Sequence, residues 1–336
     1  MGSLKFPENP NELTAGWLSD ALGFDTGPFE LTRIGAGRGN MGDLVCVSFE
    51  ADHPSIVAKF SADNLDSLAT AKRSGLNQRE VEFYLRMATR LSIRCPDCYG
   101  AWYDPETARC LLLLENIESP IELDTVAGIG VERTRQVLAE LALLHRDGFR
   151  YAHEAWLEQL ALQDMTFEPR LRNLSSMIER GWPKLMDLCG DLVPAAMGLD
   201  LAPRLVDMML GMADLPTTFV HGDAKPDNLV ATGHAGSDGE QMVVLDWQAV
   251  GKGPPCWDVA SIMINCLTVE DRRAYEDELL SSYPHDLEGY SEALLFGLVV
   301  ATALTLLGDP SQPRREQLIR TVATRSVAAL QDHGKT

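Results

Sequence analysis

One segment, at residues 221–228, constrains this chain more than any other. It reads HGDAKPDN, so an aspartate, Asp223, is followed five residues later by an asparagine, Asn228. A short apolar run at 242–245 comes next along the chain, and Asp246 stands directly at its end. Phosphoryl transfer needs a carboxylate to orient the attacking hydroxyl, and oxygen ligands to hold Mg²⁺. These residues supply both, so the segment predicts that chemistry.

The composition allows a protein of two lobes. A chain of 336 residues is long enough for two packed cores, and its 45% hydrophobic and 23% charged residues are ordinary for a globular protein. The longest uncharged apolar run, 293–307, is shorter than the roughly 20 residues that span a bilayer and predicts a buried helix. The N-terminus has no apolar stretch of the signal-peptide type. We expect a cytoplasmic protein with no membrane partner.

The formal net charge of −20 argues against a nucleic-acid partner, because phosphate backbones require a basic face. Most of this charge lies in the second part of the chain, after residue 118. A solvated acidic surface explains it, and attraction of a cationic substrate is the alternative.

The first third of the chain has the pattern of a small, β-rich lobe. Alternating apolar residues predict strands at 29–34, 44–50 and 55–60, and a further apolar strand is predicted at 110–114. Apolar residues three and four apart predict a helix at 76–91.

From about residue 130 the pattern becomes helical, as at 131–144 and 168–188. The exception is a hairpin signal at 229–247. The fold class is therefore α+β, with a small β-rich lobe at 1–117 and a mainly helical lobe at 118–336.

The order of these features resembles the aminoglycoside phosphotransferase and choline kinase-like family of small-molecule kinases, whose fold is similar to that of protein kinases. The resemblance implies that the first lobe binds the nucleotide and that the second carries catalysis and substrate binding. The spacing H-x-D-x-x-x-x-N at 221–228 is that of the kinase catalytic loop. The resemblance implies that Asp223 is the catalytic carboxylate and that Lys225 lies near the transferred phosphate. It also implies that Asn228 and Asp246 are the magnesium ligands.

The upstream residues follow in the matching order. Gly37, Gly39 and Gly42 fit the pattern G-x-G-x-x-G. A dinucleotide-binding fold would need a helix after these glycines, whereas a strand is predicted there, which favours a glycine-rich hairpin over nucleotide phosphates. Lys59, in Val-Ala-Lys, resembles the lysine that pairs with those phosphates.

The resemblance also implies a partner for this lysine. Glu80 is preferred, because the family's helix often reads Glu-x-x-Phe-Tyr, and Glu82 is the rival. Glu115 and Ile117 would lie in the hinge, where backbone groups bind the adenine or guanine edge.

Supporting residues are also implied by the resemblance. Asp258 would brace the catalytic loop, and His145 and His221 are expected to be structural. Cys95 and Cys98 are the only close cysteine pair, and they lack the further ligands that a zinc site requires.

The sequence thus predicts a kinase that uses ATP or GTP with Mg²⁺ and phosphorylates a hydroxyl of a small molecule such as an antibiotic, a sugar or an amino alcohol. A protein substrate is disfavoured, because no Ala-Pro-Glu motif follows Asp246. Two alternatives remain: a pseudokinase that binds nucleotide without turnover, and an NAD-dependent dehydrogenase. The pseudokinase is disfavoured because every catalytic position is filled. The acceptor, the preferred nucleotide and the oligomeric state are left open.

Overall fold

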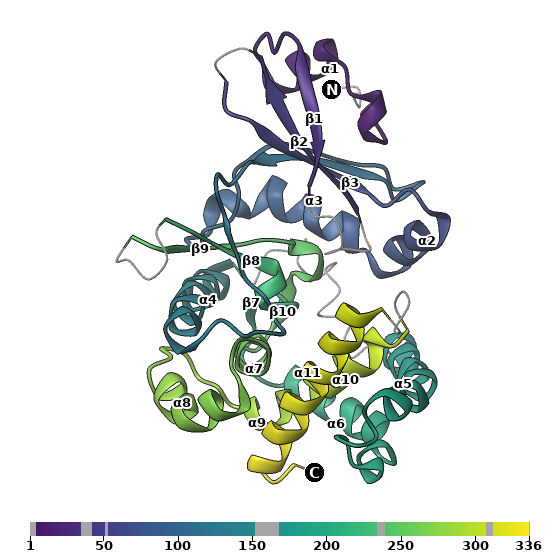
Figure 1. Ribbon diagram of the computed structural model, residues 1–336, viewed down its shortest axis with the longest axis vertical. Coiled ribbons are helices and arrows are strands. Elements are labelled where there is room, and N and C mark those ends of the chain that lie inside the picture. Colours follow the sequence, from purple (N-terminus) through teal and green to yellow (C-terminus); the bar gives the residue numbers. More distant parts are fainter. Residues whose placement is uncertain are drawn as a thin grey trace. The chain divides into compact units, whose positions relative to one another are not determined.

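The computed structural model describes residues 5–34, 42–50, 53–151, 168–233, 239–306 and 312–335 (Figure 1). The chain divides into two units. The first comprises Met1–Pro120 and Thr232–Ala249, and the second comprises Ile121–Ala231 and Val250–Thr336. Residues 232–249, which the predicted boundary after residue 117 places in the second lobe, group with the first unit.

The first unit contains a five-stranded antiparallel sheet in the order β1-β2-β3-β5-β4 (Figure 1). Its strands are β1 Phe29–Arg33, β2 Gly42–Phe49, β3 Ile56–Ser61, β4 Cys98–Tyr103 and β5 Cys110–Glu115. Its helices are α1 Ala15–Leu22, α2 Leu65–Ser74 and α3 Leu76–Arg86. The late strand β9, Gln241–Val244, also belongs to this unit.

The two faces of this sheet have different partners. One face forms an apolar core with α1, in which Leu18, Ala58 and Phe60 are almost completely buried. Successive side chains of a strand point to opposite faces. Lys59, between Ala58 and Phe60, therefore points to the other face, where Glu80 of α3 contacts it.

Two details differ from the sequence expectations. Helix α3 ends at Arg86, short of the expected residue 91, and a separate 3-10 turn occupies Ala88–Arg90. Strand β4 was not predicted. It is partly buried along most of its length and its pairing with β5 shifts between Cys98 and Gly100, so it shows no clear alternation.

The second unit is mainly helical (Figure 1). Its helices are α4 Val131–Tyr151, α5 Glu168–Cys189, α6 Leu201–Ala213, α7 Cys256–Cys266, α8 Val269–Ser281, α9 Tyr290–Ala293, α10 Leu295–Leu304 and α11 Pro313–Asp332. Short antiparallel pairs join β6 Ile121–Glu122 to β8 Leu229–Thr232, and β7 Thr218–Val220 to β10 Gly251–Gly253.

Helix α7 lies at the centre of this unit and packs against α4, α8, α9, α10 and α11. Ten of its 11 residues are buried, as expected for a helix that is apolar on all sides. Its one charged residue is Asp258, a carboxylate with 0% exposure in the core. None of the helices in the described part of the chain combines the length and the apolar character that crossing a membrane requires.

Candidate active site

The segment 221–228 begins directly after β7 and ends in a 3-10 turn at Pro226–Asn228. Gly222 has a φ of 81°, in the left-handed region that favours glycine. The segment has no regular secondary structure for most of its length, so its backbone groups need other partners. The Ser261 hydroxyl donates one hydrogen bond, of 2.7 Å, to the carbonyl of Ala224.

Asp223 is surrounded by the side chains that the sequence predicted beside it. The ammonium of Lys225 lies 2.5 Å from Asp223 Oδ2. The amide nitrogen of Asn228 donates to the carbonyl oxygen of Asp223 at 2.9 Å and to its Oδ2 at 3.0 Å. Asp223 remains 38% exposed, so a substrate hydroxyl has access to it. The Asn228 carbonyl oxygen is the group that this side chain can offer to a cation.

A second aspartate in the segment has a different role. Asp227 accepts a hydrogen bond from the hydroxyl of Thr125, a residue that is almost completely buried. The guanidinium of Arg325 in turn donates to the carbonyl of Thr125 at 2.7 Å. Thr125 was not predicted, and no local pattern marks it, because its partner lies 102 residues away in the chain.

The backbone of the segment is held by Asp258. Its Oδ2 accepts from the N–H of His221 at 2.7 Å, and its Oδ1 accepts from the N–H of Gly222 at 2.9 Å. His145 Nε2 lies 3.2 Å from the same Oδ2. The His221 ring accepts from the N–H of Asp223 at 3.3 Å. Asp258, His145 and His221 are all completely buried, so they act on the loop and not on a substrate.

The first unit contains a second cluster. Lys59 Nζ lies 2.6 Å from Glu80 Oε1 and 2.8 Å from Asp246 Oδ1. Burial lowers the pKa of Lys59, but Asp246 and Glu80 together outweigh it and raise the pKa above its usual value. The side chain is therefore an ammonium ion at neutral pH. Burial raises the pKa of Glu80, and Lys59 opposes that rise.

Glu82, the rival partner, is engaged elsewhere. It forms an ion pair with Arg86, one turn further along α3. Glu80 is 1% exposed and lies on the buried side of the helix. The structure therefore pairs Lys59 with Glu80 and not with Glu82.

Asp246 has an unusual backbone conformation. Its φ is 61°, in the left-handed region that residues other than glycine, asparagine and aspartate seldom adopt. The turn that follows it is fastened to α3. The Trp247 ring stacks on Phe83 with ring centroids 3.9 Å apart and 9° between the planes. The Arg79 guanidinium donates to the carbonyl of Gln248 at 2.8 Å. These contacts hold Asp246 beside Lys59.

The predicted hinge residues follow the end of β5. The Glu115 carboxylate bonds to Arg94 at 2.6 Å and accepts from the N–H of Asp97 at 3.0 Å. Burial raises the pKa of Glu115, but the hydrogen bond from Arg94 helps to bring it below its usual value. The Glu115 side chain is thus occupied by Arg94 and by the N–H of Asp97. Ile117 follows two residues later and is partly buried.

Of the three predicted glycines, Gly37 and Gly39 lie outside the described residues. Gly42 begins β2, where a Cβ atom would lie only 2.6 Å from the carbonyl oxygen of Phe60. Glycine is therefore required at this position for the close approach of β2 to β3.

Cys95 and Cys98 both have free thiols. Burial raises the pKa of Cys95 to about 12 and that of Cys98 to about 11, so both are protonated thiols at neutral pH. In the part of the chain that the structure describes, no three His, Cys, Asp or Glu side chains are placed to hold a metal ion together.

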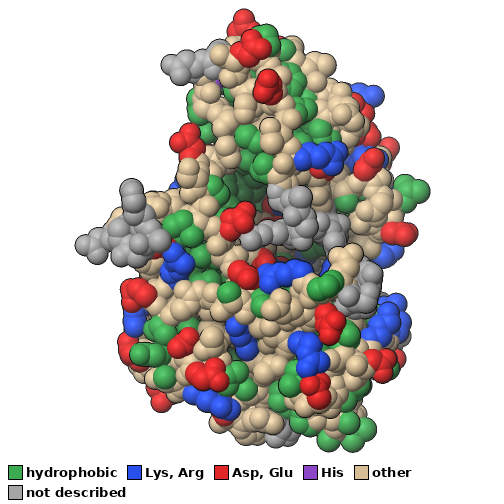
Figure 2. Space-filling view, in the orientation of Figure 1, with side chains coloured by type: hydrophobic (Ala, Val, Ile, Leu, Met, Phe, Trp, Pro, Cys, Tyr) green, Lys and Arg blue, Asp and Glu red, His purple; other side chains and the backbone are tan. Residues whose placement is uncertain are grey.

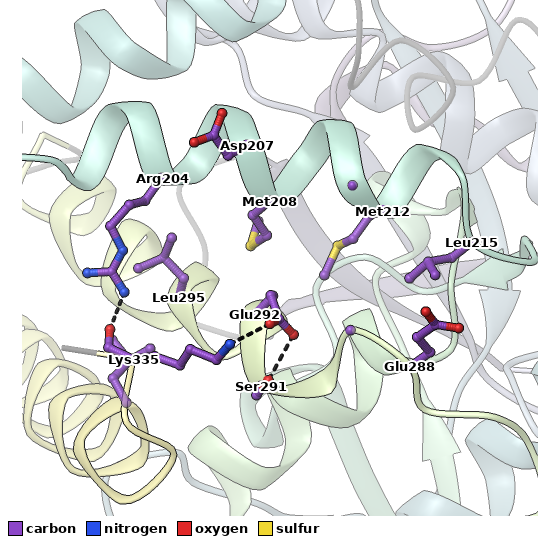
Figure 3. Close-up of a pocket in the computed structure, with 13 residues that line it drawn as sticks. Arg204, Asp207, Met208, Met212, Leu215, Glu288, Ser291, Glu292, Leu295 and Lys335 are labelled. Carbon is purple, nitrogen blue, oxygen red and sulfur yellow. Dashed lines mark hydrogen bonds and ion pairs between the residues drawn. The ribbon is translucent and has the colours of Figure 1, made fainter.

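A pocket of about 500 Å³ lies elsewhere in the second unit (Figure 3). Met208 and Met212 of α6 point into it, and an ion pair of 2.5 Å between Lys335 and Glu292 lies opposite them. None of the described residues that line it belongs to the predicted site, so the pocket is separate from Asp223, Lys225 and Asn228.

On the face shown in Figure 2, acidic side chains are spread among basic and uncharged ones.

With this geometry established, comparison with known proteins identifies the family. The family model of the phosphotransferase enzyme family matches residues 77–296, which is well over half of the chain. The chain belongs to this family. The prediction of a small-molecule kinase with a hydroxyl acceptor is confirmed at the level of the family. None of the curated proteins matches the chain.

Solved structures of this family share the fold. The GDP complex of wild-type aminoglycoside 2'-phosphotransferase-IIIa has a TM-score of 0.58 at 12% identity, over 94% of this chain and 99% of that one. Choline kinase LicA from Streptococcus pneumoniae has a TM-score of 0.51 at 16% identity, over 92% and 97%. A microcompartment-associated aminopropanol kinase has a TM-score of 0.51 at 11% identity, over 96% and 98%. The predicted α+β, kinase-like fold class is confirmed.

Proposed function

We propose that this phosphotransferase moves the γ-phosphoryl group of ATP or GTP onto a hydroxyl of a small molecule, and that Asp223 is its catalytic carboxylate. The observation that carries the proposal is the Asp223 cluster. The partly exposed carboxylate of Asp223 lies 2.5 Å from the ammonium of Lys225. Asp258 holds the loop that carries both residues by accepting hydrogen bonds from two of its backbone N–H groups.

In this cluster Asp223 accepts the proton of the attacking hydroxyl and orients its oxygen toward the phosphorus. Lys225 is placed to neutralise the charge that gathers on the phosphoryl oxygens during transfer. Asp227 accepts a hydrogen bond from the buried Thr125, so we assign it to holding the loop and not to the reaction.

The donor set fits Mg²⁺. Asn228 commits its amide nitrogen to Asp223 and so presents its carbonyl oxygen, and the carboxylate of Asp246 is 39% exposed. Both are the hard oxygen ligands that Mg²⁺ takes. We assign these two residues as its ligands. When bound, the ion neutralises phosphate oxygens of the nucleotide.

Lys59 is assigned to the phosphates of the nucleotide. Glu80 holds the ammonium in place and keeps it charged, and α3 carries both Glu80 and the contacts to the turn after Asp246. The base is assigned to the backbone of Glu115 and Ile117, and Gly37, Gly39 and Gly42 to the phosphate loop.

The acceptor is a small molecule with a hydroxyl, and antibiotics, sugars and amino alcohols are the classes to test. The related structures are named for aminoglycoside, choline and aminopropanol substrates. We place the reaction in the cytoplasm, where nucleoside triphosphates are available and where thiols stay reduced; all seven cysteines are free.

The test is a panel of hydroxylated antibiotics, sugars and amino alcohols, each incubated with Mg²⁺ and either ATP or GTP, with product identified by mass. On an accepted substrate, Asp223→Asn lowers kcat by about 10²–10⁴-fold and leaves nucleotide binding intact. Asp227→Asn is the matched control, since it changes the same residue type four positions away but loses only the contact with Thr125.

Two results would contradict the proposal. Asp223→Asn with the turnover of the wild type would remove the assigned role. A nucleotide-induced thermal shift with no phosphorylated product from any acceptor would favour the pseudokinase.

A further inference from the structure

The hydrogen bonds of Asp258 and His145 extend to a tyrosine that was not predicted as a functional residue. Tyr283 follows α8 and is 8% exposed. Its hydroxyl lies 2.6 Å from His145 Nδ1, on the opposite edge of the imidazole ring from Asp258. A buried chain of hydrogen bonds thus runs from Tyr283 through His145 to Asp258, and from there to the backbone of His221 and Gly222.

The direction of these hydrogen bonds follows from their chemistry. Burial, reinforced by the charge of Asp258, raises the pKa of Tyr283 well above its usual value, so the phenol keeps its proton. Asp258 accepts at Nε2, so a neutral His145 carries its single proton on Nε2 and has an unprotonated Nδ1. The Tyr283 phenol is then the donor to Nδ1.

The backbone of His145 is fixed separately. The Thr218 hydroxyl donates to the His145 carbonyl at 2.6 Å. Helix α4 also approaches β7 closely at Gly148, where a Cβ atom would lie 2.3 Å from the backbone nitrogen of Phe219. These contacts leave the rotation and the tautomer of the His145 ring undetermined. Tyr283 contacts Nδ1, and a hydrogen bond at this nitrogen fixes both.

We propose that Tyr283 is a positioning residue for phosphoryl transfer, which acts through His145 and Asp258 on the loop that carries Asp223. The proposal rests on the proposed function of Asp223. Tyr283 touches no substrate. It selects the His145 tautomer that donates to Asp258, so that Asp258 stays aligned with the two backbone N–H groups of the catalytic loop.

The test compares Tyr283→Phe with Tyr290→Phe. Tyr290 is the matched control because it is also buried, at 7% exposure, and its hydroxyl also makes one short hydrogen bond, of 2.5 Å to Glu276. Both variants lose a buried hydroxyl, so we expect similar decreases in thermal stability. Only Tyr283→Phe should lower kcat, by about 5-fold, with KM for nucleotide and acceptor unchanged.

The second readout needs no activity. In protein labelled with ¹⁵N at its histidines, His145→Gln assigns the His145 signal. The wild type should show an unprotonated Nδ1 and a protonated Nε2, and Tyr283→Phe should weaken this preference while Tyr290→Phe preserves it. A proton on Nδ1 in the wild type, or equal kcat values for the two variants, would overturn the inference. Failure to phosphorylate any acceptor would instead refute the proposed function. The ¹⁵N measurement of the His145 tautomer would then be the only test of the hydrogen bonds from Tyr283 to Asp258.

Discussion

The two units hold their functional aspartates in opposite ways. In the first unit, Asp246 lies in a cluster of full charges, where one ammonium, that of Lys59, bonds to two carboxylates. In the second unit, Asp258 is a single carboxylate with no charged partner among the contacts described above, and it accepts hydrogen bonds from two backbone N–H groups and an imidazole.

This difference follows from what each aspartate is attached to. Lys59 and Glu80 sit on a strand and a helix whose backbones are already hydrogen-bonded, so their side chains are left to form the ion pairs with each other and with Asp246. The loop at 221–228 has little regular structure, and its buried N–H groups need an acceptor that the fold must supply. Loss of Asp246 leaves Lys59 still paired, whereas loss of Asp258 leaves buried donors without a partner. Loss of the aspartate should therefore lower the free energy of unfolding more for Asp258 than for Asp246.

Asp258→Asn should have the largest effect. The amide that replaces one carboxylate oxygen is a donor, so it faces either the Gly222 N–H or both the His221 N–H and the imidazole N–H. An unsatisfied buried donor costs about 1–3 kcal/mol of unfolding free energy. The resulting shift of the loop should lower kcat by about 10²-fold. Chemical denaturation and steady-state kinetics measure the two effects.

The control for this variant is Glu276→Gln. Glu276 is also a buried, hydrogen-bonded carboxylate of the second unit, and its partners are Arg272, Tyr290 and His333. It should lower stability without changing kcat. If both variants lose stability but keep turnover, Asp258 is a core residue and the proposed contrast fails.

Asp246→Asn should have the second-largest effect. Asparagine tolerates the left-handed backbone, so the fold should keep its stability. Loss of the charge of a proposed ligand should weaken Mg²⁺-dependent nucleotide binding by about 30-fold, since even residues that only orient metal ligands cost about 10–100-fold when they are changed. Calorimetric titration with nucleotide, at fixed Mg²⁺ and without it, measures this. Equal affinities for wild type and variant would make Asp246 a structural residue.

Glu80→Gln and Glu82→Gln should show the smallest effects, and together they test which glutamate holds Lys59. Glu80→Gln removes a charged hydrogen bond to Lys59, which corresponds to about a 10-fold loss in kcat/KM for the nucleotide. Glu82→Gln removes only the pair with Arg86, which is half-exposed, and should change kcat/KM by less than about 2-fold. The reverse ranking would mean that the nucleotide-bound enzyme uses Glu82.

Much of the architecture could be predicted from local pattern. The strands around Lys59, the helix that carries Glu80 and the helices after residue 130 follow from the period of apolar residues, because that period reflects the geometry of each element. The spacing of Asp223 and Asn228 is likewise local. Strand β4 escaped prediction because its partial burial and irregular pairing weaken the alternation.

The sequence by itself thus determined the family and much of the order of the elements, and it supplied the residues that we propose for the chemistry. Only the tertiary structure decided which neighbours these residues have. It paired Lys59 with Glu80, assigned Asp227 to Thr125, and brought Tyr283 to His145, 138 residues away in the chain. Such contacts depend on which faces of distant elements pack together, and no short pattern records that. A residue's type shows what it can bind, whereas packing selects its partner.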